Sequence, residues 1–378
     1  MKVNSFLESF PTNSLSWDEL TFDGGQTKNI HYGLIHKGLP VITNTNDERI
    51  PFLKNENASR KRELVKSGDI IFADASEDYE GVAQAIEIGN VINPTISGLH
   101  TIHTREKDYE FSRGFKGYLF NSPTFKKQVK VLAVGTKVNS ISFKNFKDVT
   151  VSFPRSHEEQ HKVFKLLHSI DNRIEMQRKL IDSYKSLIMG FKEKIASAHY
   201  PIIVRLNQLM FETNEKVNNR IITPVAVGVL GIRHRSEIFD KELSMDYSKN
   251  KIIRKNNLCF GIGTNKIVYD VLESDDVYCV SSAYKTFKLK NIDPSVLKVI
   301  LDELNDYLSK KYMIVSARQG KSVDFEGLLS ESIRIPNIEE QNEIASKLKV
   351  FKKMAKLLDE NMILLLQLKN WLQSQMFI

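Results

Sequence analysis

The chain has 378 residues, enough for two ordinary domains with something between them, and its 41% hydrophobic and 26% charged residues are normal for a soluble globular protein. The net charge of +8 fits a polyanionic partner such as nucleic acid, although simple solubility also explains a modest basic excess. Only two cysteines are present, Cys259 and Cys279, and no CxxC occurs, which argues against a disulfide framework and a thiolate metal site.

No segment is predicted to carry the chain into or across a membrane. The first residues, MKVNSFLESFPTN, lack an apolar core of signal-peptide length. The densest apolar run, MILLLQL at 362–368, is far too short to span a bilayer. Together with the cysteine content, this predicts a protein of the reducing cytoplasm.

Residues 1–155 are expected to form a first domain of mixed α/β structure. Its last stretch, KDVTVSFP, ends at Pro154 and alternates apolar with polar residues, as a half-buried strand does. In GLHTIHT, we expect His100 and His103 to be strand residues rather than metal ligands.

A long helix is predicted over residues 156–199. Ser156 is its expected N-cap, and Glu158 and Glu159 then lie in the first turn, where the helix dipole favours acidic residues. From Leu167 a heptad pattern runs without a break, which is typical of a coiled-coil seam. Its two rows are Leu167, Ile174, Ile181, Ile188 and Ile195, and Ile170, Gln177, Tyr184, Phe191 and Ala198.

The plan of the first half is repeated at an offset of 181 residues. Residues 200–336 form the second expected α/β domain, which ends in the alternating stretch SESIRIP, and residues 337–378 form the second helix, again with Glu-Glu-Gln in its first turn. The matched registers favour packing of helix on helix, with packing of each helix on its own domain as the alternative. The rows of the second seam are Leu348, Ala355, Met362, Lys369 and Met376, and Phe351, Leu358, Leu365 and Leu372.

The first helix start also contains H-E-E-Q-H at 157–161, the H-E-x-x-H pattern of zinc proteases. His157 and His161 have the spacing of two ligands, but Phe164 and Lys165 stand where an extended motif would continue. The second copy keeps Glu-Glu-Gln but has Ile338 and Asn342 in place of the histidines. A duplicated helix start explains both copies, whereas a zinc site explains one, so no metal site is predicted.

The chain resembles the specificity subunits of Type I restriction–modification systems. The resemblance lies in Pro followed by EEQ entering a heptad helix, twice, each time after an α/β domain. Stretches such as LVKSGDIIFADASEDYEGVAQAIEIGN, NKIIRKNNLCFGIGTN and SARQGKSVDFEGLL agree in order and extend it from about residue 30 onward. It implies an α/β (α+β) fold in which two mixed α/β target recognition domains are joined by two long antiparallel helices that form a coiled coil, with a pseudo-twofold internal repeat.

The resemblance also implies a non-catalytic, sequence-specific DNA recognition subunit of a larger complex. Each recognition domain would read one half of a bipartite target in double-stranded DNA, and the helices would set the spacer. Two modification (methyltransferase) subunits would dock on the helices, and restriction (translocase–nuclease) subunits would join them. No cofactor is expected on this chain; S-adenosylmethionine, and ATP with Mg, are expected on the partner subunits.

Motifs for chemistry are missing from the sequence. There is no G-x-x-x-x-G-K-[ST] phosphate loop, and neither Asn93-Pro94-Thr95 nor Asp293-Pro294-Ser295 continues as a base-holding methyltransferase tetrapeptide. CFGIGTN (259–265) mimics a methyltransferase cofactor loop, but a strand ending in a glycine turn is preferred. A DNA adenine methyltransferase with a disguised loop, and a coiled-coil adaptor without DNA specificity, remain as alternatives.

Base reading requires Arg, Lys, Asn or Gln side chains on ordered loops, although a solvated surface explains any single basic loop equally well. Tyr32, Tyr284 and Asn265 are weaker candidates than the basic clusters. The candidate DNA-contacting residues are Arg60, Lys61, Arg62, Lys137, Asn139, Arg233, His234, Arg235, Asn265, Arg318, Gln319 and Lys321.

Overall fold

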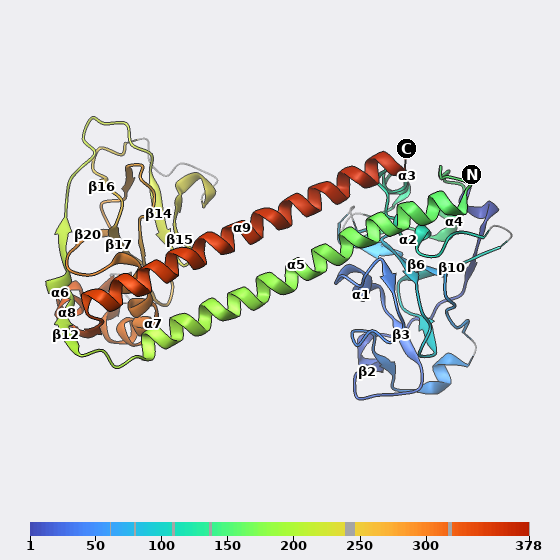
Figure 1. Ribbon diagram of the computed structural model, residues 1–378, viewed down its shortest axis with the longest axis horizontal. Coiled ribbons are helices and arrows are strands. Elements are labelled where there is room, and N and C mark those ends of the chain that lie inside the picture. Colours follow the sequence, from blue (N-terminus) through green and yellow to red (C-terminus); the bar gives the residue numbers. More distant parts are fainter. Residues whose placement is uncertain are drawn as a thin grey trace. The chain divides into compact units, whose positions relative to one another are not determined.

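The computed structural model describes residues 1–60, 62–78, 81–107, 110–135, 138–238, 246–316 and 320–377. The chain divides into two compact units: a first unit of residues 1–178 with 360–378, and a second unit of residues 179–359. Two long helices, α5 (His157–Ser197) and α9 (Ile338–Met376), contribute a segment to each unit (Figure 1). The predicted fold class, mixed α/β domains with two long helices, is confirmed.

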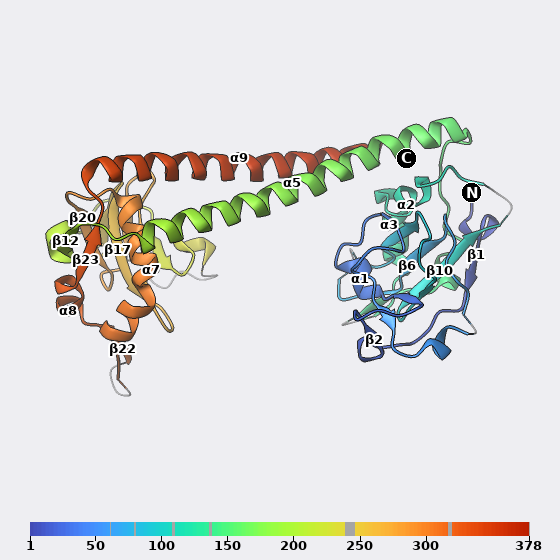
Figure 2. The ribbon, with the colours of Figure 1, turned by 60° about the horizontal axis from the view of Figure 1, so that its bottom comes forward.

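The first unit is built on a five-stranded sheet in the order β1-β10-β6-β8-β4, of which Figure 2 labels β1, β10 and β6. Of the strand pairs in this sheet, only β4 and β8 are parallel. The central strand β6 is buried at every position, as expected of a short apolar run. The strands are β1 (Leu7–Phe10), β10 (Thr101–Glu106), β6 (Ile70–Ala73), β8 (Ala85–Ile88) and β4 (Ile42–Thr43).

Smaller elements complete this unit. A four-stranded sheet has the order β2 (Leu20–Thr21), β5 (Phe52–Leu53), β3 (Lys28–Ile30) and β9 (Thr95–Ser97), and β11 (Asn139–Ser140) pairs with β7 (Ala75–Ser76). The helices are α1 (Tyr32–His36), α2 (Phe115–Leu119), α3 (Pro123–Leu132) and α4 (Phe143–Phe146), with 3-10 turns η1 (Val3–Ser5), η2 (Trp17–Glu19) and η3 (Glu56–Ser59).

A cluster of phenylalanines forms the core of the first unit. The ring of Phe72, from β6, lies 5.1 Å from the ring of Phe120 and 5.1 Å from that of Phe146. Phe377, which follows α9, packs its ring 5.6 Å from that of Phe115 and is 2% exposed. Burial of a side chain this large contributes about 2–3 kcal/mol, so the end of α9 is anchored in this core.

In its described residues, the second unit contains a four-stranded antiparallel sheet in the order β13-β20-β17-β18 and four two-stranded pairs. The strands of the sheet are β13 (Met210–Thr213), β20 (Lys285–Leu289), β17 (Asn257–Ile262) and β18 (Ile267–Val271). The pairs are β12 (Ile202–Arg205) with β23 (Ser332–Ile335), β14 (Val225–Gly228) with β15 (Gly231–His234), β16 (Lys251–Ile253) with β19 (Tyr278–Val280), and β21 (Met313–Ser316) with β22 (Gly320–Val323).

Helix α7 (Pro294–Tyr312) covers this sheet (Figure 2). Asp293 caps it by accepting from the backbone N–H groups of Ser295 and Val296, and Pro294 fits the first turn, where no N–H is needed. Its buried face joins a core that includes Phe260 and Phe287 of the sheet. The shorter helices are α6 (Leu206–Leu209) and α8 (Phe325–Ser330), and η4 (Arg235–Glu237) is a 3-10 turn.

The two stretches expected to be strands before the long helices differ. SESIRIP contains β23, which pairs antiparallel with β12. The strand prediction for KDVTVSFP is wrong, because Thr150 makes only an isolated bridge to Lys2. The neighbouring chain turns into η1 at Val3 and cannot continue a ladder, although Val149 and Val151 are buried as their alternation indicated.

Both long helices start with a side-chain cap. The predicted N-cap is confirmed, since Ser156 Oγ accepts from the backbone N–H of Glu159 at 3.4 Å. Helix α9 uses a capping box, in which Asn337 accepts from the N–H of Glu340 at 3.0 Å and Glu340 accepts from the N–H of Asn337 at 2.9 Å. At equivalent positions, the two copies therefore use different residues to accept hydrogen bonds from the backbone N–H groups that have no partner within the helix.

Candidate nucleic-acid interface and helix seam

The candidate DNA contacts of the first unit differ in their exposure to solvent. Arg60, at the end of η3, is exposed, and Arg62 is half-buried. Lys61 and Lys137 lie outside the described residues. Asn139 is only 6% exposed, in the short strand β11. Arg60 and Arg62 are thus open to solvent to different degrees, whereas the side chain of Asn139 lies inside the domain.

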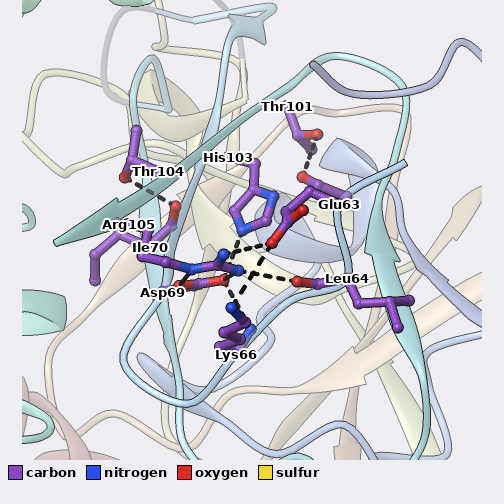
Figure 3. Close-up of polar contacts among 10 residues, drawn as sticks. Glu63, Leu64, Lys66, Asp69, Ile70, Thr101, His103, Thr104 and Arg105 are labelled. Atoms are coloured by element: carbon purple, nitrogen blue, oxygen red, sulfur yellow. Dashed lines mark hydrogen bonds and ion pairs between the residues drawn. The ribbon is translucent and has the colours of Figure 1, made fainter. Parts of the chain in front are cut away.

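A polar network that the sequence did not predict follows the Arg60–Arg62 cluster (Figure 3). Arg105, in β10, donates to both carboxylate oxygens of Asp69, each at 2.8 Å, and to the carbonyl of Leu64 at 2.9 Å. It also donates to Glu63. His103, on the same face of β10, forms a 2.7 Å hydrogen bond with Asp69. Since Glu63 and Leu64 directly follow the cluster, the network ties it to the sheet.

The charges in this network stabilise one another. Burial acts to raise the pKa of Asp69, but hydrogen bonds from His103 and Arg105 outweigh burial, so this pKa lies below its ordinary value of 3.8. The hydrogen bond from Arg105 also lowers the pKa of Glu63, and the hydrogen bond to Asp69 raises the pKa of Arg105. The one available sequence signal was the spacing of His103 and Arg105 by two, which puts both on one face of a strand.

In the second unit, Arg233 and His234 lie in β15 and Arg235 begins η4; all three are half-buried. Arg233 and His234 line a cavity of about 400 Å³ together with Asp270 and Lys298. Lys298 Nζ lies 3.3 Å from a carboxylate oxygen of Asp270. The cavity wall therefore mixes both signs of charge, unlike a uniformly basic phosphate site.

The structure brings together two predicted residues that are far apart in sequence. Asn265 is exposed in the turn between β17 and β18, and Lys321 is exposed in β22. Lys321 Nζ donates to the carbonyl of Thr264, the residue before Asn265. Arg318 and Gln319 lie outside the described residues. Strand β22 thus brings the ammonium of Lys321 to the turn that carries Asn265.

The methyltransferase-like stretch CFGIGTN is the end of β17 and the following turn, which confirms the preferred interpretation. Gly261 has a packing role: a Cβ there would lie 2.3 Å from Cε1 of Tyr284. The hydroxyl of Tyr284 reaches the carbonyl of Val227 at 3.5 Å, so this half-buried ring serves the sheet.

His157 and His161 are both exposed in the first two turns of α5. His161 lines a cavity of about 400 Å³ with Phe164 and His168, and the last two rings stack at 5.2 Å. Within the described residues, no group of three or more His, Cys, Asp or Glu side chains is arranged to hold a metal ion.

The glutamine of each Glu-Glu-Gln has the same contacts in both units. Gln160 donates to the carbonyl of Pro154 at 2.8 Å and accepts from the N–H of Ser112 at 2.9 Å. Gln341 donates to the carbonyl of Pro336 at 2.9 Å and accepts from the N–H of Asp293, also at 2.9 Å. Both side chains are buried, 0% and 3% exposed. Sequence repetition singled out this glutamine, but its partners were not predicted.

Within the first unit, α5 and α9 contact each other in antiparallel order. Asn361 donates to Gln177 at 3.2 Å, and Lys369 pairs with Asp171 at 2.5 Å. Leu167 and Leu372 pack into the phenylalanine core, so here the helices also pack on their own domain. Of the predicted seam residues of this unit, Leu167, Ile170 and Ile174 are buried and Met362, Leu365 and Leu372 are half-buried.

Within the second unit the helices also face each other. The ring of Phe351 meets those of Tyr184 and Phe191 edge-on, at 5.9 and 5.1 Å. Ile195 is buried with Tyr200, against Leu348. The other predicted seam residues here, Ile181, Ile188 and Leu358, are half-buried, as are Tyr184, Phe191, Leu348 and Phe351.

A further row of apolar side chains on α9, outside the seam, is exposed to solvent. Val350 and Leu357, in the second unit, and Leu364 and Trp371, in the first, are spaced by seven and are between 48% and 62% exposed. Such spacing places residues on one face of a helix, and exposed apolar patches mark surfaces for other proteins. No helix in the described part of the chain is long and apolar enough to cross a membrane.

Comparison with known proteins finds the same duplication. A family model described as Type I restriction modification DNA specificity domain matches residues 32–183 and again 209–365. The Type I restriction enzyme MjaVIII specificity subunit of Methanocaldococcus jannaschii is 28% identical over 165 residues, which are 43% of this chain and 38% of that relative. The match thus spans less than half the length of that curated relative.

Two solved structures share the fold. The S subunit of a Type I restriction–modification system from M. genitalium is 12% identical, with a TM-score of 0.59 over 100% of this chain and 95% of its own. A chain from a study of complex assembly and conformational transition of the type I R-M system is 14% identical, with a TM-score of 0.57 over 99% and 96%. At these identities the likeness concerns the fold alone.

Proposed function

This chain belongs to the family of Type I restriction–modification DNA specificity domains, and on that premise we propose that it is the sequence-specific DNA recognition subunit of such a complex. Residues 1–155 and 200–336 each read one half of a bipartite DNA target. Residues 156–199 and 337–378, which contain α5 and α9, set the spacer between the halves.

The observation that carries this proposal is the duplicated construction. Two α/β units each deliver a long helix from a Pro–Glu-Glu-Gln junction, with the same two hydrogen bonds from the glutamine. A target read as two halves separated by a fixed gap requires two readers and a rigid separator. One catalytic domain would require neither the duplication nor the paired helices.

Among the candidate contacts that the structure describes, the exposed side chains are those of Arg60, Asn265 and Lys321. An asparagine side chain can pair bidentately with adenine, whereas a lysine suits phosphate as well as guanine. We therefore assign Asn265 to base reading, and Lys321 to holding the turn that carries it and to the neighbouring phosphate. In the first unit we assign a DNA-contacting role to Arg60, which is exposed at the end of η3.

The exposed apolar row of α9 supports docking of partner subunits. Residues such as Leu364 and Trp371 would be covered in the assembled complex, which removes the cost of exposing them to water. We propose that two methyltransferase subunits bind the helices and that restriction subunits join them. S-adenosylmethionine, and ATP with Mg, belong to those partners, so this chain performs no catalysis.

Cys259 and Cys279 are free and buried, which suits the cytoplasm.

The test is to co-express the chain with the methyltransferase genes beside it and to map modified bases in the host genome. We expect one bipartite motif with a fixed unspecific spacer. A continuous motif, or no motif, would contradict the proposal.

Asn265→Ala sharpens this experiment. Loss of a bidentate contact should cost about 1–3 kcal/mol of discrimination at one base of one half-site, while the other half-site serves as internal reference. Asn342→Ala, which removes an exposed asparagine from the first turn of α9, is the matched control and should leave both half-sites unchanged.

The alternatives differ in what the isolated chain and the complex bind. A methyltransferase acting alone would bind S-adenosylmethionine tightly without partners, and we expect no such binding. A coiled-coil adaptor would leave the complex without DNA affinity. We expect DNA affinity that falls steeply with salt, since phosphate contacts release counterions.

A further inference from the structure

We propose that Gln160 and Gln341 are positioning residues that hold each recognition domain at a fixed angle to the helix leaving it, and thereby restrict the complex to one spacer length. The proposal rests on the proposed function and goes beyond it by assigning spacer selectivity to two side chains. Neither is placed in contact with DNA or with a partner subunit.

Gln160 and Gln341 make the same pair of hydrogen bonds in their two units. In both units the amide Nε2 donates to the carbonyl of the proline that ends the domain, and Oε1 accepts from a backbone N–H. That N–H belongs to a residue 48 positions earlier in each case, Ser112 or Asp293. Asp293 caps α7, and Ser112 accepts from the N–H of Phe115, the first residue of α2. Each glutamine therefore joins three segments: the domain end, the long helix and the start of a domain helix.

The repeat keeps the glutamine although neighbouring residues change. The residues on either side of the shared Glu-Glu-Gln differ between copies, with His157 and His161 in the first and Ile338 and Asn342 in the second. The caps differ as well, Ser156 against Asn337. A side chain needed only to fill space could be replaced by an apolar residue of similar size, and its net hydrogen-bond stabilisation is modest. Two directional bonds in a buried site instead fix an orientation.

The length of each helix amplifies a change of angle at its start. Helices of 41 and 39 residues are about 60 Å long, so a swing of about 3° at the start of a helix displaces its far end by about one base-pair step of 3.4 Å. A junction that tolerates a few degrees would therefore accept neighbouring spacer lengths. The rigid ring of each proline limits rotation at the junction, and the two hydrogen bonds of the glutamine limit it further.

The experiment uses the co-expressed complex with Gln341→Met, Gln160→Met and both together. Methionine keeps length and approximate volume but makes neither hydrogen bond. The measurement is the ratio of methylation at the wild-type spacer to methylation at spacers one base pair longer and shorter. Because the ratio is taken within one sample, any loss of folded complex cancels. Gln341→Glu, which keeps the acceptor and loses the donor, is a second variant, and Asn342→Ala is the control.

We expect the ratio to fall about tenfold in each methionine variant, the order of effect of losing one or two hydrogen bonds, with unchanged half-site bases. Gln341→Glu should lie between wild type and methionine. A purely structural glutamine would lower methylation equally at every spacer, and that result, or an unchanged ratio, overturns the proposal. If the wild-type complex itself shows no bipartite motif, the proposed function fails first, so the two failures are distinguishable.

Discussion

The buried carboxylate of Asp69 holds together a network of polar groups by accepting several hydrogen bonds. Its side chain is 1% exposed and accepts from Arg105, from His103 and from the backbone N–H of Lys66. The ring of Phe10 lies 4.8 Å from the guanidinium of Arg105 and covers it. Removing one member of such a buried set leaves its partners without compensation, which costs more than the set contributes in total.

Asp69→Asn should therefore destabilise the protein by about 3 kcal/mol, the low end for a broken buried pair, because Arg105 retains Glu63. Urea unfolding measures this loss. The control is Asp148→Asn, which removes an exposed ion pair with Lys2 and should change stability by less than about 0.5 kcal/mol. Equal effects of the two variants would show that the network is unimportant for stability.

The same carboxylate predicts a pH dependence. The folded-state pKa of Asp69 is below 3.8, so its contribution to stability is fully present above that value and is lost as the pH falls through the folded-state pKa. The difference in unfolding free energy between wild type and Asp69→Asn should be constant near neutral pH and shrink on acidification below 3.8. A difference in unfolding free energy that grows on acidification would mean that folding raises, rather than lowers, the pKa of Asp69.

His157 and His161 should be dispensable. Both are exposed at the start of α5, and Asn342 already stands at the position equivalent to His161. Changing both to Asn should leave DNA methylation by the complex within about twofold of wild type, as surface substitutions usually have effects below 0.5 kcal/mol. Stoichiometric zinc in the purified protein, lost in this double variant along with methylation, is the contrary result.

The packing of α5 and α9 on each other depends on the burial of the heptad rows of side chains on each helix. Leu365 lies one turn from both Asn361 and Lys369, whose partners on α5 are Gln177 and Asp171. A residue in this position faces the other helix, and it is half-buried. The neighbouring residue Leu364 is 62% exposed, which makes the two leucines a matched pair.

Leu365→Asp should lower the unfolding free energy by about 3 kcal/mol, because it removes apolar burial and places a charge in the seam. Leu364→Asp should leave thermal unfolding nearly unchanged and instead weaken co-purification of the methyltransferase subunits. The assignment of faces is wrong if Leu365→Asp unfolds like wild type or if Leu364→Asp is the more damaging change.

The duplicated construction of the chain predicts that its two recognition domains act as separate modules. Each unit has its own core, and each contains its own glutamine junction. If each domain reads separately, replacing one leaves the contacts inside the other intact.

Replacing residues 200–336 by the matching domain of a relative should thus change one half of the methylated motif and keep the other half and the spacer. Genome-wide mapping of modified bases checks all three features at once. A swap that alters both halves together would mean that recognition is shared between the domains.

Sequence repetition was sufficient for the architecture but not for the contacts. The heptad rows located the seam, since every predicted seam residue is buried or half-buried. Of the predicted DNA contacts, Lys61, Lys137, Arg318 and Gln319 lie outside the described residues. The remainder stay predictions, and Asn139 lies inside its domain because β11 is covered, which no local pattern signals.

The sequence by itself determined the duplication, the two long helices with their registers, and the family, because helix periodicity and caps are properties of neighbouring residues. Tertiary structure alone decided that Gln160 meets Ser112, that Arg105 meets Asp69 and Glu63, and that Lys321 meets the turn of Asn265. It also decided that KDVTVSFP forms no strand, because the chain beside it turns away. Such partners are chosen by the packing of whole domains, in which residues tens of positions apart compete for the same buried donors and acceptors.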